Sequence, residues 1–182
     1  MRTKIKEEIL PQLRRSKFTV NMDKIGWSDA ELKGLVTSNL DTLVLEELLY
    51  TATLFEDNDT KLALYKKATV VAPGCLRAHN NMGVVLYNMG DLEGAATAFN
   101  AAKAIRDHDI INNNIGAIAL KNGDVAAAKE AFTASLGAGS KVNYNLGIVG
   151  VKEGEYEAAV NYFGSDPSFN ASLAMYLKGD AE

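Results

Sequence analysis

The sequence predicts an all-α fold, a solenoid of about four helical hairpins closed by one further helix and preceded by a short N-terminal arm. Two observations predict it. A pattern of glycine, alanine and phenylalanine recurs at spacings of 33 and 31 residues along the chain. Apolar residues recur at helical spacing between these glycines, and no proline interrupts His79 to Met89 or Leu92 to Ile105.

The repeat is defined by five aligned columns, which is too many for a chance spacing. The columns are Asn81, Asn114 and Asn145; Gly83, Gly116 and Gly147; Gly90, Gly123 and Gly154; Ala95, Ala128 and Ala159; and Phe99, Phe132 and Phe163. We expect the inner glycine and the alanine to lie where the two helices of a hairpin cross, because small residues let their backbones approach. The phenylalanine then fills the space beside that crossing.

Each unit is predicted to contain two helices that meet at a glycine followed by an acidic residue. In the first clear unit these are Gly90 and Asp91. Glycine ends a helix in the left-handed conformation without a Cβ penalty. The acidic residue caps the free amides that open the next helix. A lone hairpin cannot bury its apolar face, so such units are expected to stack into an array.

The chain therefore divides into residues 1–40, the arm, and residues 41–182, the helical array. The expected units are about 41–75, 76–108, 109–139 and 140–164, followed by a terminal helix over 166–178. Asp166 is expected to cap that helix, with Pro167 as its first residue. We expect Phe169, Leu173 and Tyr176 to face the array, which would make this helix its C-terminal cap.

The array resembles the tetratricopeptide repeat family. The residues that carry the resemblance are Met82, Gly83, Leu86, Ala95, Phe99 and Ala102; Ile115, Gly116, Ala119, Ala128, Phe132 and Ser135; and Leu146, Gly147, Gly150, Ala159 and Phe163. A more diverged unit carries Leu49, Tyr65, Ala68 and Pro73 at the matching positions. The family's early tryptophan is absent. The resemblance implies a right-handed α-solenoid whose first helices line a concave face.

The arm has a different composition from the array. Residues 1–40 carry eight Lys/Arg and five Asp/Glu, whereas residues 41–182 carry eleven Lys/Arg and eighteen Asp/Glu. Lys17 to Met22 alternates polar and apolar residues, which predicts a strand. Ser28 and Glu31 have the spacing of a capping box, which predicts a short helix after them.

Residues Leu10 to Val20 resemble the closing strand of an OmpA-like domain. That resemblance implies that the chain is part of a larger cell-envelope protein, located in the envelope or periplasm. The other interpretation is an ordinary extended arm that lies on the first repeat, in which case a cytoplasmic location is expected. The residues leave both interpretations open.

Composition excludes several classes of function. The single cysteine and the two histidines among 182 residues provide too few ligands for a thiolate cluster or a zinc site, so we expect no metal and no cofactor. No uncharged apolar run approaches the length of a membrane span, so no membrane insertion is expected. The acidic array is a poor binder of phosphate backbones, so nucleic acid is not an expected partner.

Catalysis is not expected either. Cys75 and His79 lie four residues apart at the start of a helix, a spacing that could make the thiolate a nucleophile. However, no orienting group or oxyanion hole accompanies them. We therefore interpret Cys75 as a turn residue and His79 as a packing residue. His108 stands between acidic residues in an inter-repeat turn, where capping of the next helix is the expected role.

The candidate binding residues form three trios on the first helices, with members four and three residues apart, so that each trio lies on one side of its helix. We call these nine residues the concave stripe: Asn80, Val84 and Tyr87; Asn113, Ala117 and Leu120; and Tyr144, Ile148 and Val151. The recurring asparagines could bind the backbone of an extended peptide. They could equally join adjacent repeats. The family's lysine and asparagine clamp for a C-terminal carboxylate is absent, because Tyr50, Val84, Ala117 and Ile148 occupy its asparagine positions.

The sequence thus favours a non-enzymatic protein–protein interaction module that binds a protein or peptide on the concave face. The alternative is a structural or assembly segment of a larger cell-envelope protein, with its groove filled by its own arm or by another copy. A homodimer through the arm would follow from an exposed strand edge, since unpaired backbone groups seek a partner.

Overall fold

A computed structural model describes residues 26–179, and in this range the chain is helical with no strand. The expected strand at Lys17 to Met22 and the OmpA-like segment lie outside the described residues. The α-helices are α3 (Asp29–Ser38), α4 (Leu45–Thr53), α5 (Asn58–Val71), α6 (Leu76–Met89), α7 (Leu92–Ile105), α8 (Asp109–Lys121), α9 (Val125–Thr133), α10 (Ser140–Glu153), α11 (Tyr156–Phe163) and α12 (Phe169–Lys178). Two 3-10 turns, η2 (Leu40–Thr42) and η3 (Leu136–Ala138), precede α4 and α10.

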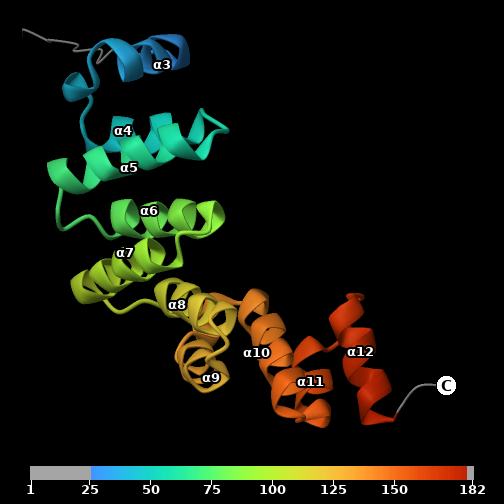
Figure 1. Ribbon diagram of the computed structural model, residues 1–182. Helices are drawn as coiled ribbons and strands as arrows, with labels where there is room; N and C mark the ends of the chain where they lie inside the picture. Colours follow the sequence, from blue (N-terminus) through green and yellow to red (C-terminus); the bar gives the residue numbers. More distant parts are fainter. Residues whose placement is uncertain (1–25, 180–182) are drawn as a thin grey trace, which may run out of the picture.

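The helices stack as successive hairpins, which confirms the predicted all-α solenoid. The hairpins are α4–α5, α6–α7, α8–α9 and α10–α11, and α12 follows as a single helix packed on α11. Figure 1 shows the chain running from α3 through these hairpins and bending between α8 and α10, with α7 and α9 on the outer side of the bend. Contacts are strongest within a hairpin and between neighbours along the chain, as expected for a repeat array.

The glycine and phenylalanine columns meet inside each hairpin. A Cβ on Gly83 would lie 2.6 Å from the ring of Phe99, and one on Gly116 would lie 2.6 Å from the ring of Phe132. Gly147 stands in the same relation to Phe163, at 2.7 Å. The phenylalanine rings therefore occupy the space that a side chain on the glycine would need. This contact is the physical reason for two of the five aligned columns.

The turn between the helices follows the predicted chemistry in the second and third hairpins, whereas in the fourth Glu155 makes no side-chain capping bond and pairs with Lys129 instead. Gly90 has a φ of 86°, in the left-handed region that only glycine adopts without strain. Asp91 then accepts a hydrogen bond from the backbone N–H of Gly94 at 2.8 Å and caps α7. Asp124 caps α9 in the same way, accepting from the N–H of Ala127 at 3.0 Å.

The N-terminal end of the described chain contains the predicted capping box. The backbone N–H of Ser28 donates to Glu31 Oε2 at 2.8 Å, and the N–H of Glu31 donates to Ser28 Oγ at 3.4 Å. These bonds open α3, whose Leu32 is buried in the first core cluster. The Tyr50 hydroxyl of α4 donates to Asp29 Oδ1 at 3.0 Å, so α3 is tied to the first hairpin.

The predicted terminal helix begins later than expected, and the face that it buries was predicted wrongly. Ser168 is its N-cap, and Asp166 instead accepts from the backbone N–H of Ser168 at 2.9 Å, so α12 starts at Phe169. Ala171 and Ala174 are buried, whereas Phe169 is 79% exposed and Tyr176 67% exposed. Small side chains bring α12 close to α11, because alanine allows near contact of the backbones.

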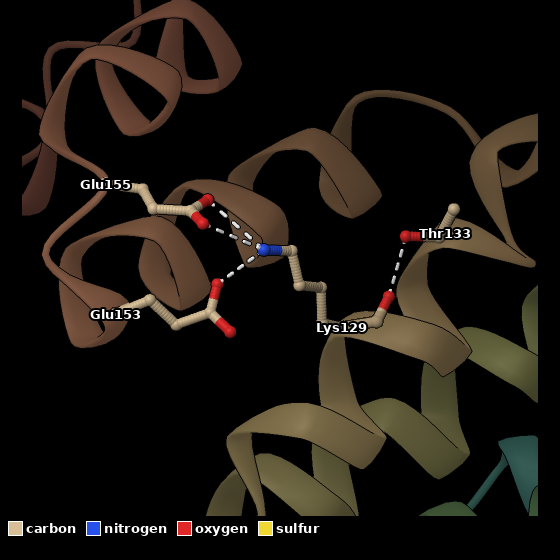
Figure 2. Close-up of polar contacts among 4 residues, drawn as sticks. All are labelled: Lys129, Thr133, Glu153 and Glu155. Atoms are coloured by element: carbon tan, nitrogen blue, oxygen red, sulfur yellow. Dashed lines mark hydrogen bonds and ion pairs between the residues drawn. The ribbon is translucent and has the colours of Figure 1, made fainter.

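An ion-pair group ties the third hairpin to the fourth (Figure 2). Lys129 Nζ of α9 lies 2.7 Å from Glu153 Oε2 at the end of α10 and 3.1 Å from Glu155 Oε2 in the following turn. The hydrogen bonds with these two carboxylates raise the pKa of Lys129. The group is exposed, so water and salt screen it.

Candidate functional site

The recurring asparagines form hydrogen bonds from one hairpin to the next. Asn114 Nδ2 of α8 donates to Asn80 Oδ1 of α6 at 2.9 Å, and Asn145 Nδ2 of α10 donates to Asn113 Oδ1 of α8 at 2.9 Å. All four side chains are half-buried. Of the two roles considered for these residues, joining adjacent repeats is the one that these bonds support directly.

A matching side-chain hydrogen bond joins the fourth hairpin to α12. Asn170 Nδ2 donates to the hydroxyl of Tyr144 at 2.8 Å, and Tyr144 is the stripe residue that aligns with Asn80 and Asn113. The ring of Tyr144 also meets Phe163 edge to face, with the centroids 5.4 Å apart. Tyr144 therefore anchors α12 through its hydroxyl and the hairpin core through its ring.

Most of the concave stripe is used in packing. Tyr87 packs against the second core cluster, Ala117 and Leu120 against the third, and Tyr144, Ile148 and Val151 against the fourth. Among the nine stripe residues only Val84 is exposed, with 38% of its surface accessible. The structure thus spreads the stripe along the hairpin junctions and does not gather it into one deep groove.

Val84 lines a hollow of about 350 Å³ between the first and second hairpins. Polar side chains surround it, including Asn58 of α5 and Asn81 and Asn88 of α6. Tyr65 lies in its wall, where burial raises the pKa of the hydroxyl and a side-chain hydrogen bond with Asn81 opposes that shift. The hollow offers amide donors and acceptors beside an apolar surface, which is the mixture that an extended backbone with apolar side chains needs.

A fourth trio extends the stripe, contrary to the expectation that its residues face the array. Phe169, Leu173 and Tyr176 have the same four-and-three spacing as the other trios. Asn170 follows Phe169 as Asn145 follows Tyr144, and it makes the matching bond to the preceding first helix. This register places the trio on the face that continues the concave stripe. The spacing was visible in the sequence, but the expected cap at Asp166 obscured it.

The catalytic candidates have structural roles. His79 Nε2 lies 2.9 Å from the backbone oxygen of Pro73, within the turn that precedes α6. Cys75 occupies the N-cap position of that helix. His108 Nδ1 accepts from the backbone N–H of Ile110 at 3.2 Å and caps α8, as expected. Among the described residues, no group of three or more histidine, cysteine or acidic side chains could hold a metal ion.

The repeated sequence pattern of these helical hairpins is also found in a family of known proteins. The sequence matches the tetratricopeptide repeat family over residues 56–110 and 114–167, more than half of the chain. The chain belongs to the tetratricopeptide repeat family. This family consists in general of non-enzymatic scaffolds that mediate protein–protein interactions. Among curated proteins, none matches this tetratricopeptide repeat chain.

Solved structures share the fold at low sequence identity. A structure of PilF from Pseudomonas aeruginosa is 22% identical with a TM-score of 0.69, covering 84% of this chain and 76% of that one. YrrB, described as a tetratricopeptide repeat protein with an unusual peptide-binding site, is 17% identical with a TM-score of 0.62, covering 85% and 87%. A chain of the Cut9–Hcn1 hetero-tetramer is 16% identical with a TM-score of 0.64, covering 82% of this chain and only 29% of that one.

Among the helices of this tetratricopeptide array described between residues 26 and 179, every one is too short or too polar to traverse a lipid bilayer.

Proposed function

We propose that this protein is a non-enzymatic interaction module that binds an extended segment of a partner protein along the concave face of its array. The observation that carries the proposal is the hollow at Val84. An exposed valine there stands beside the amides of Asn81 and Asn88, on the first helix of a hairpin. The peptide-binding site described for YrrB, which has the same fold, supports this use of the scaffold.

Only part of the hydrogen-bonding capacity of the stripe asparagines is left for a bound peptide. Asn80 and Asn113 already accept hydrogen bonds from the next hairpin through their oxygens. A bound peptide would therefore use the amide groups that these bonds leave over, such as the Asn113 N–H₂ group. Replacing these asparagines would disturb stacking and binding together. For that reason Val84 is the better residue to test.

The test compares two exposed valines. Val84 lies on the first helix α6, and Val70, which is 73% exposed, lies on the second helix α5. A phage-displayed library of random peptides is selected on the purified protein, and the enriched peptides are synthesised and titrated by fluorescence anisotropy. Val84→Glu should weaken their binding by about ten-fold or more, because it replaces an apolar contact with a hydrated carboxylate that must lose water when the peptide binds.

Val70→Glu is the matched control, since it makes the same substitution in a helix of the outer layer. Its binding should equal that of the wild type, and both variants should keep the helical circular dichroism signal. Enriched peptides that bind the Val84→Glu variant as tightly as the wild type would contradict the proposal. A selection that enriches no peptide dependent on Val84 would contradict it as well.

A further inference from the structure

The C-terminal end of the concave face is more apolar and more exposed than the rest. Phe169 and Tyr176 of α12 are 79% and 67% exposed, although they are among the largest apolar side chains in the protein. They project from the same helix as Leu173, and the Asn170–Tyr144 hydrogen bond fixes that helix against α10. Exposed aromatic side chains held on a rigid helix are typical of interface anchors, because they bury much area at little cost in conformational entropy.

Lysines flank the stripe at this end. Lys121 follows Leu120, and Lys152 follows Val151, each at the residue after the last member of its trio. Lys141 lies one helical turn before Tyr144, on the same side of α10 as Lys152. All three lysines are exposed, and none makes an ion pair with a described carboxylate.

Asp109 is the one acidic residue of α8, one turn before Asn113 on the stripe side, and its carboxylate lies beside Gly137 of η3. The residues of the two trios on α8 and α10 are apolar or uncharged, and Glu153 lies on the opposite side of α10, where it pairs with Lys129. Asp166 stands before α12, where its carboxylate accepts a backbone hydrogen bond from Ser168. On the second hairpin, Arg77 holds the repeat position of Lys141 but pairs with Glu46. Lys61 of α5 lines the hollow at Val84, and the three lysines beside the stripe lie in the C-terminal half of the array. This positive strip occurs on a chain whose net charge is −4.

We infer that the C-terminal half of the concave face binds an acidic segment of a partner protein that carries large apolar side chains. This inference rests on the proposed function and specifies the partner. Phe169, Leu173 and Tyr176 would contact the apolar side chains, while Lys121, Lys141 and Lys152 would attract the carboxylates along one edge. Charge complementarity also disfavours the chain's own arm as the occupant, because residues 1–22 carry six Lys/Arg and two Asp/Glu.

The experiment uses the peptides enriched on the wild-type protein. We expect them to be acidic and to contain aromatic or aliphatic residues. Binding should fall steeply with added salt, since the attraction of exposed charges is screened. The double variant Lys141→Glu with Lys152→Glu should bind about ten-fold more weakly or worse, and the double variant Phe169→Ala with Tyr176→Ala should lose at least as much.

The control for charge is Lys66→Glu with Lys103→Glu, which changes the net charge equally on the second helices α5 and α7. This control should bind as the wild type does. The aromatic residues are exposed, so their replacement should leave thermal stability unchanged, and a melting curve checks this.

The outcomes separate this inference from the proposed function. Peptides that depend on Val84 but are neutral or basic, or that bind the lysine variants normally, would leave the proposed function standing and overturn the inference. Enriched peptides that depend on neither Val84 nor the C-terminal residues would overturn both. A dimer in sedimentation velocity that Phe169→Ala with Tyr176→Ala converts to a monomer would assign the surface to a second copy and overturn the inference too.

Discussion

Asn114 donates a hydrogen bond to Asn80 across the boundary between the second and third hairpins, with 2.9 Å between Nδ2 and Oδ1. When the repeats are aligned, Asn114 corresponds to Asn81, one position after the acceptor Asn80. The bond therefore joins two different, adjacent positions of the repeat. Asn145 with Asn113, and Asn170 with Tyr144, repeat this offset. These side-chain hydrogen bonds therefore connect successive repeats, and any contact with a ligand would be made in addition to them.

The first prediction is that Asn80 and Asn114 are coupled in stability. Asn80→Ala and Asn114→Ala should each lower the free energy of unfolding by about 1 kcal/mol, and the double variant should lose less than the sum. Urea unfolding of all four proteins gives the coupling energy, which we expect to be about 0.5–1.5 kcal/mol. Additive losses would show that the two amides do not depend on each other.

The second prediction concerns Gly116, where a Cβ would lie 2.6 Å from the ring of Phe132. Phe132 is fully buried, so its ring has no room to move aside. Gly116→Ala should therefore destabilise the protein by about 1–3 kcal/mol. Gly34→Ala is the control, because Gly34 lies inside α3 with nothing within 4 Å of its added Cβ. That substitution should be neutral or stabilise the protein by up to about 1 kcal/mol.

The fold was predictable because its determinants are local and repeated. Gly83 and Phe99 recur with a fixed spacing, and a helical hairpin is the simplest structure that brings the two residues into contact. Asn80 was harder to interpret, because its partner lies in the next repeat and is offset by one position. That offset depends on how two first helices pack side by side, which a periodic pattern does not specify.

The start of α12 was missed because two capping signals compete. Asp166 followed by Pro167 is a good start for a helix, but Ser168 is also a good N-cap, and its hydroxyl accepts from the backbone N–H of Ala171 at 3.3 Å. Packing decides between them. Ala171 and Ala174 fit closely on α11, and this contact turns Phe169 and Tyr176 outward.

The third prediction concerns Lys129, which lies between Glu153 and Glu155 in Figure 2. Its pKa is raised above 10.5 in the folded protein. The stabilisation is therefore fully present below the unfolded-state pKa and is lost as the pH rises through the folded-state pKa. Lys129→Met should lower the melting temperature slightly at neutral pH. That difference should shrink in high salt and as the pH rises through the folded-state pKa of Lys129, as thermal melts can test.

Lys103→Met is the control for that measurement, since Lys103 is exposed and forms no ion pair with a described carboxylate. It should show a smaller effect with little dependence on salt. A Lys129 effect that persists unchanged in high salt would indicate that the alkyl chain, and not the charge, stabilises the junction.

The fourth prediction concerns the arm, of which residues 1–25 lie outside the described structure. The array from α4 onward buries its own core, beginning with Leu48 and Leu49. Deleting residues 1–22 should therefore leave the helical circular dichroism signal per residue of the array unchanged. Any dimer seen by sedimentation should weaken in the truncated protein. A truncated chain that unfolds would make the arm part of the core.

The fifth prediction tests how far a local loss spreads along the array. Phe99 is 2% exposed and fills the crossing between α6 and α7, so Phe99→Ala should cost about 3–5 kcal/mol. In a stack where each hairpin contacts only its neighbours, the loss is expected to fall first on the hairpin that contains it. Amide exchange over residues 76–108 should therefore accelerate well before exchange over residues 140–179. The inter-hairpin bonds of Asn80 and Asn113 act against such local unfolding, because they couple the stability of one first helix to that of the next. If they dominate, protection will fall uniformly along the chain, and the array will prove to be one cooperative unit.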